Sequence, residues 1–259
     1  MGTTKLTRKE ILAEDPVHEA IIQIIEFFRT NGKMVGVVVA IALVLALGIY
    51  GGIQYLGNQE LKAQETLGKG IDFFHAEVAA DATNNPYSKG LTPTFPSDLA
   101  KYKAAAKEFS SIVDGHNFGK ITVVARYYLG ISQLQMGQKQ EAIRNLEQVS
   151  SSSKERTLGY LAKRILAAEH MNSGNYKGAR EILESLIKDP QCQLPKEDLS
   201  LQLSKVLVAQ GKRDEAIKVL RDASSQGTAF SSYQQQVATE LAKLQKSPAA
   251  ATNPQPARP

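Results

Sequence analysis

The sequence predicts an all-α chain in which a single long apolar helix precedes a stack of repeated helix pairs. Two observations lead to this prediction. Residues 34–56 contain no charged side chain, and the segment that follows repeats a pattern of glycine, alanine and leucine at a spacing of 37 residues. An uncharged stretch of this length is typical of a membrane span, and a repeat of this period is typical of stacked helical units.

Residues 34–56 have the length and composition of a transmembrane helix. At about 1.5 Å per residue the segment extends ~30–35 Å, which matches the hydrocarbon thickness of a bilayer. Tyr50 and Tyr55 stand where aromatic residues anchor a span at the membrane interface. A buried core helix is the alternative, but the absence of any charged face disfavours it.

A cleaved signal peptide is the other alternative for this segment. Signal peptides have a short basic leader followed by an apolar run of ~7–15 residues. Here the preceding head, residues 1–33, is long and acidic residues are spread along it, namely Glu10, Glu14, Asp15, Glu19 and Glu26. We therefore predict an uncleaved anchor.

The head is predicted to contain an amphipathic helix between Pro16 and Asn31. Asp15-Pro16 is a typical helix start, and Asn31-Gly32 is a typical stop. Apolar residues share one face of this helix, which predicts contact with the membrane surface or with a partner helix.

Basic residues near the span favour a cytoplasmic head, with the rest of the chain on the other side of the membrane. Arg29 and Lys33 come directly before the span, and further basic residues lie near the N-terminus. The predicted topology is a single pass with the N-terminus inside.

Residues 57–246 are predicted to form the repeat domain. A turn glycine, a small residue and a leucine recur at intervals of 37 residues: Gly137, Gly174 and Gly211; Ala142, Ala179 and Ala216; Leu146, Leu183 and Leu220. The glycine is expected to end the first helix of each pair, and the alanine and leucine to pack the second helix against it.

An earlier, interrupted repeat is predicted before these three. Ala105, Phe109 and Ile112 continue the pattern of the second helix, and the helix at about 59–80, with Leu67-Gly68 as its matching pair, would be its partner. The connection 81–97 contains three prolines and is expected to lack regular structure. A last helix at 229–246 would cap the stack, and the tail 247–259 is expected to be disordered.

The repeats resemble the tetratricopeptide repeat, whose pattern has Leu-Gly, a turn glycine, an alanine and a large apolar residue in this order. Leu129-Gly130 matches the first part of that pattern. The period of 37 instead of 34 and the missing aromatic residue of the first helix are departures. The resemblance implies a solenoid that binds proteins.

The sequence provides little for catalysis or for cofactors. The four histidines are far apart, and Gly119-Lys120 lacks the rest of a phosphate-binding loop. Cys192 is the single cysteine, so an internal disulfide is excluded. The net charge of +5 is dispersed, which gives no support to nucleic-acid binding. We predict no enzyme activity, no metal and no cofactor.

The resemblance implies a concave binding surface lined by the first helix of each pair. By this resemblance, the outward positions of these helices would include Tyr127, Ile131, Arg164, Ala168, Leu201 and Lys205. Arg164 and Lys205 could favour an acidic segment, but charges on a solvated face are the alternative. Within the span, Gly48 and Gly52 have the spacing that allows two membrane helices to pack closely.

The order of a short head, a single span and a repeat domain resembles the bacterial ancillary subunit of the SecYEG translocon. This resemblance implies a protein of the inner membrane with periplasmic repeats, which associates with the translocon and with a periplasmic chaperone or prolyl isomerase. The alternative hypothesis is a scaffold for assembly of cell-envelope or division complexes.

Overall fold

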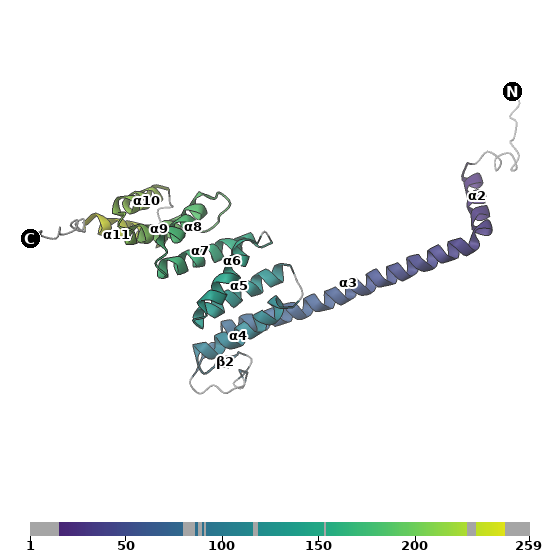
Figure 1. The fold of residues 1–259 in the computed structure, drawn as a ribbon, viewed down its shortest axis with the longest axis horizontal. Coiled ribbons are helices and arrows are strands. Elements are labelled where there is room, and N and C mark those ends of the chain that lie inside the picture. Colours follow the sequence, from purple (N-terminus) through teal and green to yellow (C-terminus); the bar gives the residue numbers. More distant parts are fainter. Residues whose placement is uncertain are drawn as a thin grey trace, which may run out of the picture. The chain divides into compact units, whose positions relative to one another are not determined.

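A computed structural model describes residues 16–79, 86–87, 90, 92–115, 119–152, 154–226 and 232–246 (Figure 1). Within these residues the regular secondary structure is helical apart from two short strands, which confirms the predicted all-α class. The elements in order are α2 (Pro16–Thr30), α3 (Gly32–Phe74), β1 (Glu77–Val78), β2 (Thr94–Phe95), α4 (Asp98–Val113), α5 (Lys120–Gln135), α6 (Lys139–Ser150), α7 (Arg156–Asn172), α8 (Tyr176–Lys188), α9 (Lys196–Ala209), α10 (Arg213–Gln226) and α11 (Ser232–Lys246).

The chain divides into two compact units, Met1–Leu61 and Lys62–Pro259. The first contains α2 and the apolar part of α3. By length and composition, α3 is able to cross a membrane. Its apolar side chains are exposed, with Val44 and Leu47 each 69% accessible, so the described residues provide no protein cover for this surface.

The head helix is present as predicted. It begins at Pro16 and ends at Thr30, next to Asn31. The proposed cap Asp15 lies outside the described residues. The apolar side chains of Ile21 and Ile25 in this helix are exposed.

The three turn glycines adopt one conformation, as the repeat pattern predicts. Gly137, Gly174 and Gly211 have φ values of 79°, 78° and 74°, a region that is strained for residues with a Cβ atom. In each turn the residue after the glycine donates its backbone N–H to a carbonyl five residues earlier, at 2.8 Å. This is the hydrogen bond of a Schellman motif, so each first helix ends in the same way.

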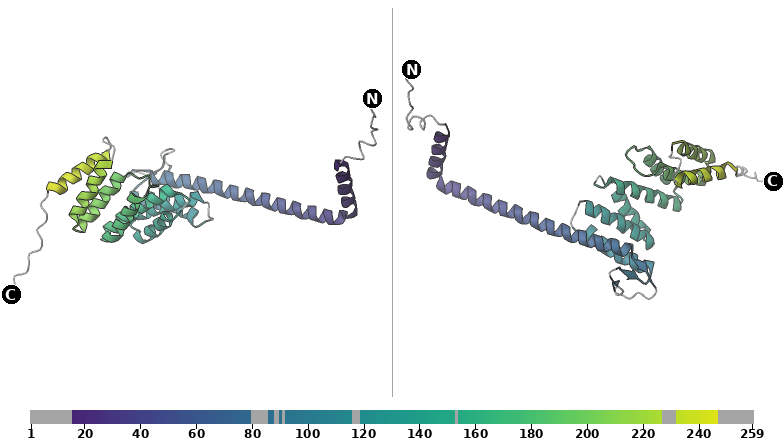
Figure 2. Two further views of the ribbon diagram at one scale, coloured as in Figure 1. Left: turned by 90° about the horizontal axis from the view of Figure 1, so that it is seen from above. Right: turned by 180° about the vertical axis from the view of Figure 1, so that it is seen from behind.

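The small and large residues of the repeat form the centre of the second unit. The three alanines of the pattern are fully buried, and Leu146, Leu183 and Leu220 are at most 1% exposed. Each helix from α4 to α11 packs against the next one in the chain, which produces the stack seen in Figures 1 and 2. The predicted tetratricopeptide-like solenoid is therefore confirmed.

The earlier repeat is also present, but one predicted residue pair in it is wrong. Ala105, Phe109 and Ile112 are buried as expected. Gly68, however, faces open space, and the glycine that meets Phe109 is Gly70. The position in α3 that faces the second helix is therefore two residues later than predicted. The ring of Phe109 fits there because Gly70, opposite it, has no side chain.

The described part of the connection after α3 contains regular structure, which differs from the prediction. The helix ends at Phe74, before the predicted end at residue 80, and β1 then pairs with β2 in parallel. Phe95 of β2 packs edge-on against Phe73 at 5.3 Å, and the Lys101 Nζ atom donates to the Ala76 carbonyl at 3.2 Å. These contacts attach β2 to α3, and α4 to the residues just after α3.

The C-terminal end of the stack is formed by α11, which covers α10 and also contacts α9. Val237 and Leu244 of α11 are buried in the core of the last repeat. The helix thus covers the exposed end, as expected of a cap. The predicted disordered tail, residues 247–259, lies outside the described residues.

Candidate protein-binding groove

The first helices of the pairs, α5, α7, α9 and α11, lie along one side of the stack. Besides its neighbours in sequence, α5 contacts α7 and α9 contacts α11. Between α7 and α9 the link is an ion pair, in which the Arg164 Nη1 atom lies 2.9 Å from the Asp198 Oδ2 atom. We call the surface along these four helices the first-helix groove.

On α5, the predicted positions Tyr127 and Ile131 are half-buried. The ring centroids of Tyr127 and Tyr128 lie 5.6 Å apart. Tyr127 also packs against the hydrophobic core formed by residues of α5, α6 and α7. Burial raises the pKa of the Tyr127 hydroxyl, and the positive charge of Arg164 acts in the opposite direction. Tyr127 and Arg164 are thus close enough to interact electrostatically.

On α7, Arg164 and Ala168 are half-buried. The Asp198 carboxylate that holds Arg164 also accepts a hydrogen bond from the Gln202 Nε2 atom at 3.0 Å. Arg164 is therefore compensated within the groove and is not a free cation available to an acidic ligand.

On α9, the two predicted positions differ from each other. Leu201 is 7% exposed and belongs to the core of the last repeats, whereas Lys205 is exposed. Both nevertheless line a hollow of about 480 Å³ between α9 and α11. The structure thus brings Leu201 and Lys205 together at the C-terminal end of the groove.

The sequence did not predict several of the residues that line this hollow. Gln202 lines it from α9, and Gln235, Gln236 and Thr239 line it from α11. The repeat period contains the information needed to find two of them, because 37 residues beyond Asp198 and Gln202 stand Gln235 and Thr239.

The hollow offers hydrogen bonding to uncharged groups beside three charged side chains, those of Asp198, Lys205 and Glu240. Side-chain amides and hydroxyls both donate and accept, which suits the alternating N–H and C=O groups of a peptide main chain. Among the residues that the structure describes, no group of histidine, cysteine or acidic side chains is arranged to hold a metal ion.

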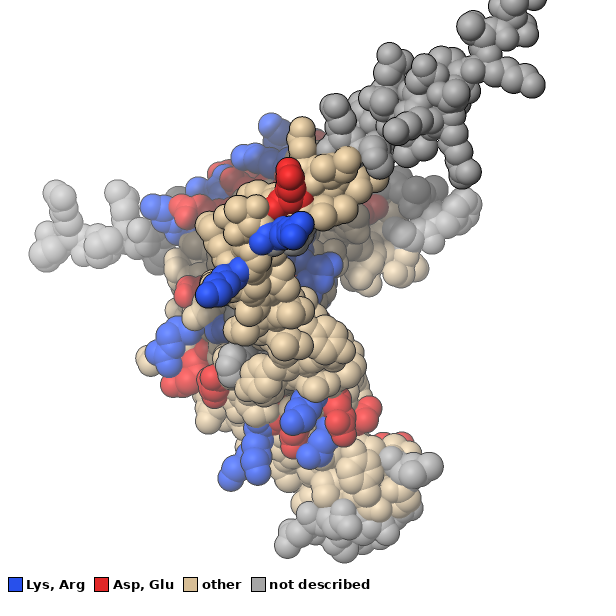
Figure 3. All heavy atoms as spheres, turned by 90° about the vertical axis from the view of Figure 1, so that its right-hand side faces the viewer, with Lys and Arg blue, Asp and Glu red and all other residues tan. Residues whose placement is uncertain are grey.

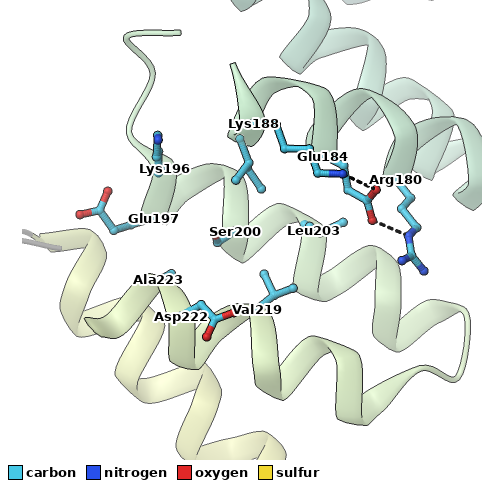
Figure 4. Close-up of a pocket in the computed structure, with 11 residues that line it drawn as sticks. Arg180, Glu184, Lys188, Lys196, Glu197, Ser200, Leu203, Val219, Asp222 and Ala223 are labelled. Atoms are coloured by element: carbon cyan, nitrogen blue, oxygen red, sulfur yellow. Dashed lines mark hydrogen bonds and ion pairs between the residues drawn. The ribbon is translucent and has the colours of Figure 1, made fainter. Parts of the chain in front are cut away.

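A second hollow, of about 720 Å³, lies among α8, α9 and α10 (Figure 4). Its charged residues largely neutralise one another. The Arg180 Nε atom lies 2.7 Å from the Glu184 Oε1 atom and its Nη2 atom lies 2.9 Å from Glu215, and the bond to Glu184 raises the pKa of Arg180. Small residues form its floor: Ser200 and Ala223 stand where the preceding repeat has Lys163 and Leu186.

On one face of the molecule, basic and acidic side chains are mixed. In Figure 3, basic and acidic side chains are interspersed on the face shown, and no large area carries a single sign. Ion pairs between neighbouring helices, such as Lys69 with Glu108 at 2.9 Å, are consistent with this arrangement.

Gly48 and Gly52 lie on the exposed surface of α3. A Cβ atom built on either glycine would have no neighbour within 4 Å among the described residues. The close packing of a second helix at these positions stays a prediction.

Comparison with known proteins agrees with the architecture. Residues 124–253 match the family described as tetratricopeptide repeat-like domain, a match that covers half of the chain and most of the helices from α5 to α11. No match is found among curated proteins or among solved structures. Stacked repeats of this kind typically present extended surfaces for binding other proteins.

Proposed function

The chain belongs to the tetratricopeptide repeat-like family, and on this basis we propose that it is a non-catalytic scaffold that binds other proteins beside a membrane. The observation that carries the proposal is the first-helix groove with its hollow between α9 and α11. The hollow combines side-chain amides and hydroxyls with the charged groups of Asp198, Lys205 and Glu240, and the amides and hydroxyls suit hydrogen bonding to the main chain of a polypeptide.

The proposed anchor is the apolar part of α3. An exposed apolar surface of this extent is unstable in water, and insertion into a bilayer removes it from water. In this arrangement α2, only one residue before α3, lies with its apolar face in the headgroup region. The proposed topology places the head in the cytoplasm and the repeats on the other side of the inner membrane.

The proposed partners are the Sec translocon and a periplasmic chaperone or prolyl isomerase. Support for them comes from the resemblance in the order of head, span and repeats. The role would be to hold such a chaperone near secreted chains as they leave the translocon.

The anchor is tested by fractionation of cells that produce the full chain with a C-terminal tag. We expect the full-length protein in the membrane fraction, resistant to extraction with alkaline carbonate. A mature protein that begins after Leu56 and is recovered in the soluble fraction would contradict the proposal, because it would make the apolar helix a cleaved signal sequence.

The partners are tested by site-specific photocrosslinking in whole membranes. Probes at Lys205 and Gln236 lie in the hollow of the groove, and a probe at the exposed Lys218 on α10 is the matched control. We expect crosslinks to translocon subunits or to a periplasmic folding factor from the first two positions only. Crosslinks only to cell-wall or division proteins would favour the alternative scaffold.

A further inference from the structure

A third hollow, of about 510 Å³, lies between α4 and α5, and we call it the α4–α5 hollow. Leu99 and Ala106 of α4, Leu129 of α5 and Met136 of the following turn give it apolar walls. Ala106 and Leu129 are buried at its base, while Leu99 is 59% exposed at one end.

This hollow exists because one repeat position is small. Ala106 directly follows the buried alanine of its helix, and the residues at the same position in later second helices are Ile143, Arg180 and Ile217. The two isoleucines pack against the cores of their repeats. In α4 the missing side-chain volume leaves open space beside Leu129.

The rim of the hollow is positively charged. Lys103 and Lys107 are exposed on α4, and the other lining residues carry no acidic group. Residues four apart lie on the same side of a helix, so the two ammonium groups repel each other. Neither forms an ion pair with any residue that the structure describes, whereas Lys101 on the same helix is paired with Asp98 at 3.3 Å.

We propose that the α4–α5 hollow binds an amphipathic helix of a partner protein, with apolar side chains inserted beside Ala106 and carboxylates placed on Lys103 and Lys107. The hollow extends along α4 from Leu99 to Ser110, which is long enough to take the side chains at positions i, i+3, i+4 and i+7 by which a helix is anchored in a groove. A flat membrane surface would fit poorly, because Ala106 and Leu129 lie at the base of the hollow.

This site is separate from the first-helix groove. None of the predicted groove residues lines it, and a variant in the groove is therefore expected to leave it intact. The two binding activities can be tested independently in the same protein.

The test uses the full chain in nanodiscs of phosphatidylcholine and a fluorescent helical peptide of roughly 18 residues, composed of leucine, alanine and glutamate. A second peptide has lysine in place of every glutamate. We expect the acidic peptide to bind and the basic peptide to bind at least about tenfold more weakly, with an affinity for the acidic peptide that falls as salt is added.

Two variants probe the site. Lys103→Glu combined with Lys107→Glu reverses the rim charge, and Ala106→Ile fills the hollow with the residue that two later repeats carry. Each is expected to weaken binding of the acidic peptide about tenfold or more. Lys218→Glu combined with Arg221→Glu makes the same change in net charge on α10 and is expected to change the affinity less than about twofold, as is Lys205→Glu in the groove.

Thermal unfolding of each variant confirms that the repeats remain folded. The proposal is overturned if the acidic peptide does not bind, if both peptides bind equally, or if the control on α10 weakens binding as much as the change at the rim. Binding to phosphatidylglycerol vesicles that depends on Lys103 and Lys107, without competition from the peptide, would overturn it in favour of a lipid surface.

Discussion

Gly70 lies directly against the ring of Phe109. A Cβ atom at position 70 would be 2.6 Å from the Cε1 atom of the ring, a distance that requires one of the two residues to move. The same relationship recurs one repeat later, where a Cβ atom at Gly130 would lie 2.9 Å from the Cγ atom of Leu146. Close approach of the paired helices thus depends on a glycine opposite a large side chain.

The first prediction concerns two glycines of α3 that differ in their surroundings. Gly70→Ala should destabilise the repeat domain by about 1–2 kcal/mol, because overpacking outweighs the gain in helix propensity. Gly68→Ala, which faces open space, should stabilise it by about 0.5–1 kcal/mol. Denaturant unfolding of the full chain in detergent, followed by circular dichroism, measures both.

A second substitution separates overpacking from other effects at position 70. Phe109→Leu removes part of the ring that a new methyl group would meet, so the double variant should lose less stability than the sum of the two single changes. Strict additivity would show that the contact is not the cause.

The second prediction concerns the turn at Gly174. Its φ of 78° is unfavourable for residues with a Cβ atom, so Gly174→Ala should cost about 1–2 kcal/mol. Asparagine tolerates this conformation better, and Gly174→Asn should therefore cost less than the alanine variant. Equal losses for the two variants would point to a cause other than backbone strain.

The repeat period was sufficient to predict much of the fold. Because stacked repeats place equivalent residues in equivalent environments, the spacing of 37 residues identified the turn glycines and the buried alanines and leucines of three pairs. The apolar helix was equally evident, since a run without charges needs no tertiary information to be recognised.

The residues that depend on contacts between neighbouring helices could not be predicted in this way. The choice of Gly70 over Gly68 is determined by where the ring of Phe109 lies, and the pairing of β1 with β2 joins segments on either side of a long connection. In the groove, the partner of Arg164 is Asp198 on the next first helix, at a position that the repeat does not keep constant.

The third prediction separates stability from binding at the C-terminal end of the groove. Leu201 is buried in the core, so Leu201→Ala should cost about 2–4 kcal/mol of stability. Lys205→Ala, which changes an exposed residue of the same hollow, should alter stability by less than about 0.5 kcal/mol. Denaturant unfolding distinguishes the two, and a small loss for Leu201→Ala would mean that its side chain is free to bind a ligand.

The fourth prediction concerns the hydrogen bond that the Tyr160 hydroxyl donates to the Asp189 Oδ2 atom at 2.8 Å. The pKa of Asp189 is lowered by the backbone N–H of Gln191 and by Tyr160, and the bond to Asp189 raises the pKa of Tyr160. A lowered carboxyl pKa gives stability that is present above the unfolded pKa of about 4 and is lost as the pH falls through the folded value. A raised tyrosine pKa gives stability that is present below about pH 10 and is lost as the pH rises further.

Tyr160→Phe should therefore lower the melting temperature at pH 7, and the difference from the unchanged protein should shrink as the pH falls from about 4 through the lowered pKa of Asp189 in the folded protein. Tyr176→Phe is the matched control, since the Tyr176 hydroxyl forms no hydrogen bond with the part of the chain that the structure describes. Its effect should not vary between pH 7 and pH 3. A difference for Tyr160→Phe that stays constant over the same range would show that the loss comes from packing of the ring and not from the bond to the ionised carboxylate.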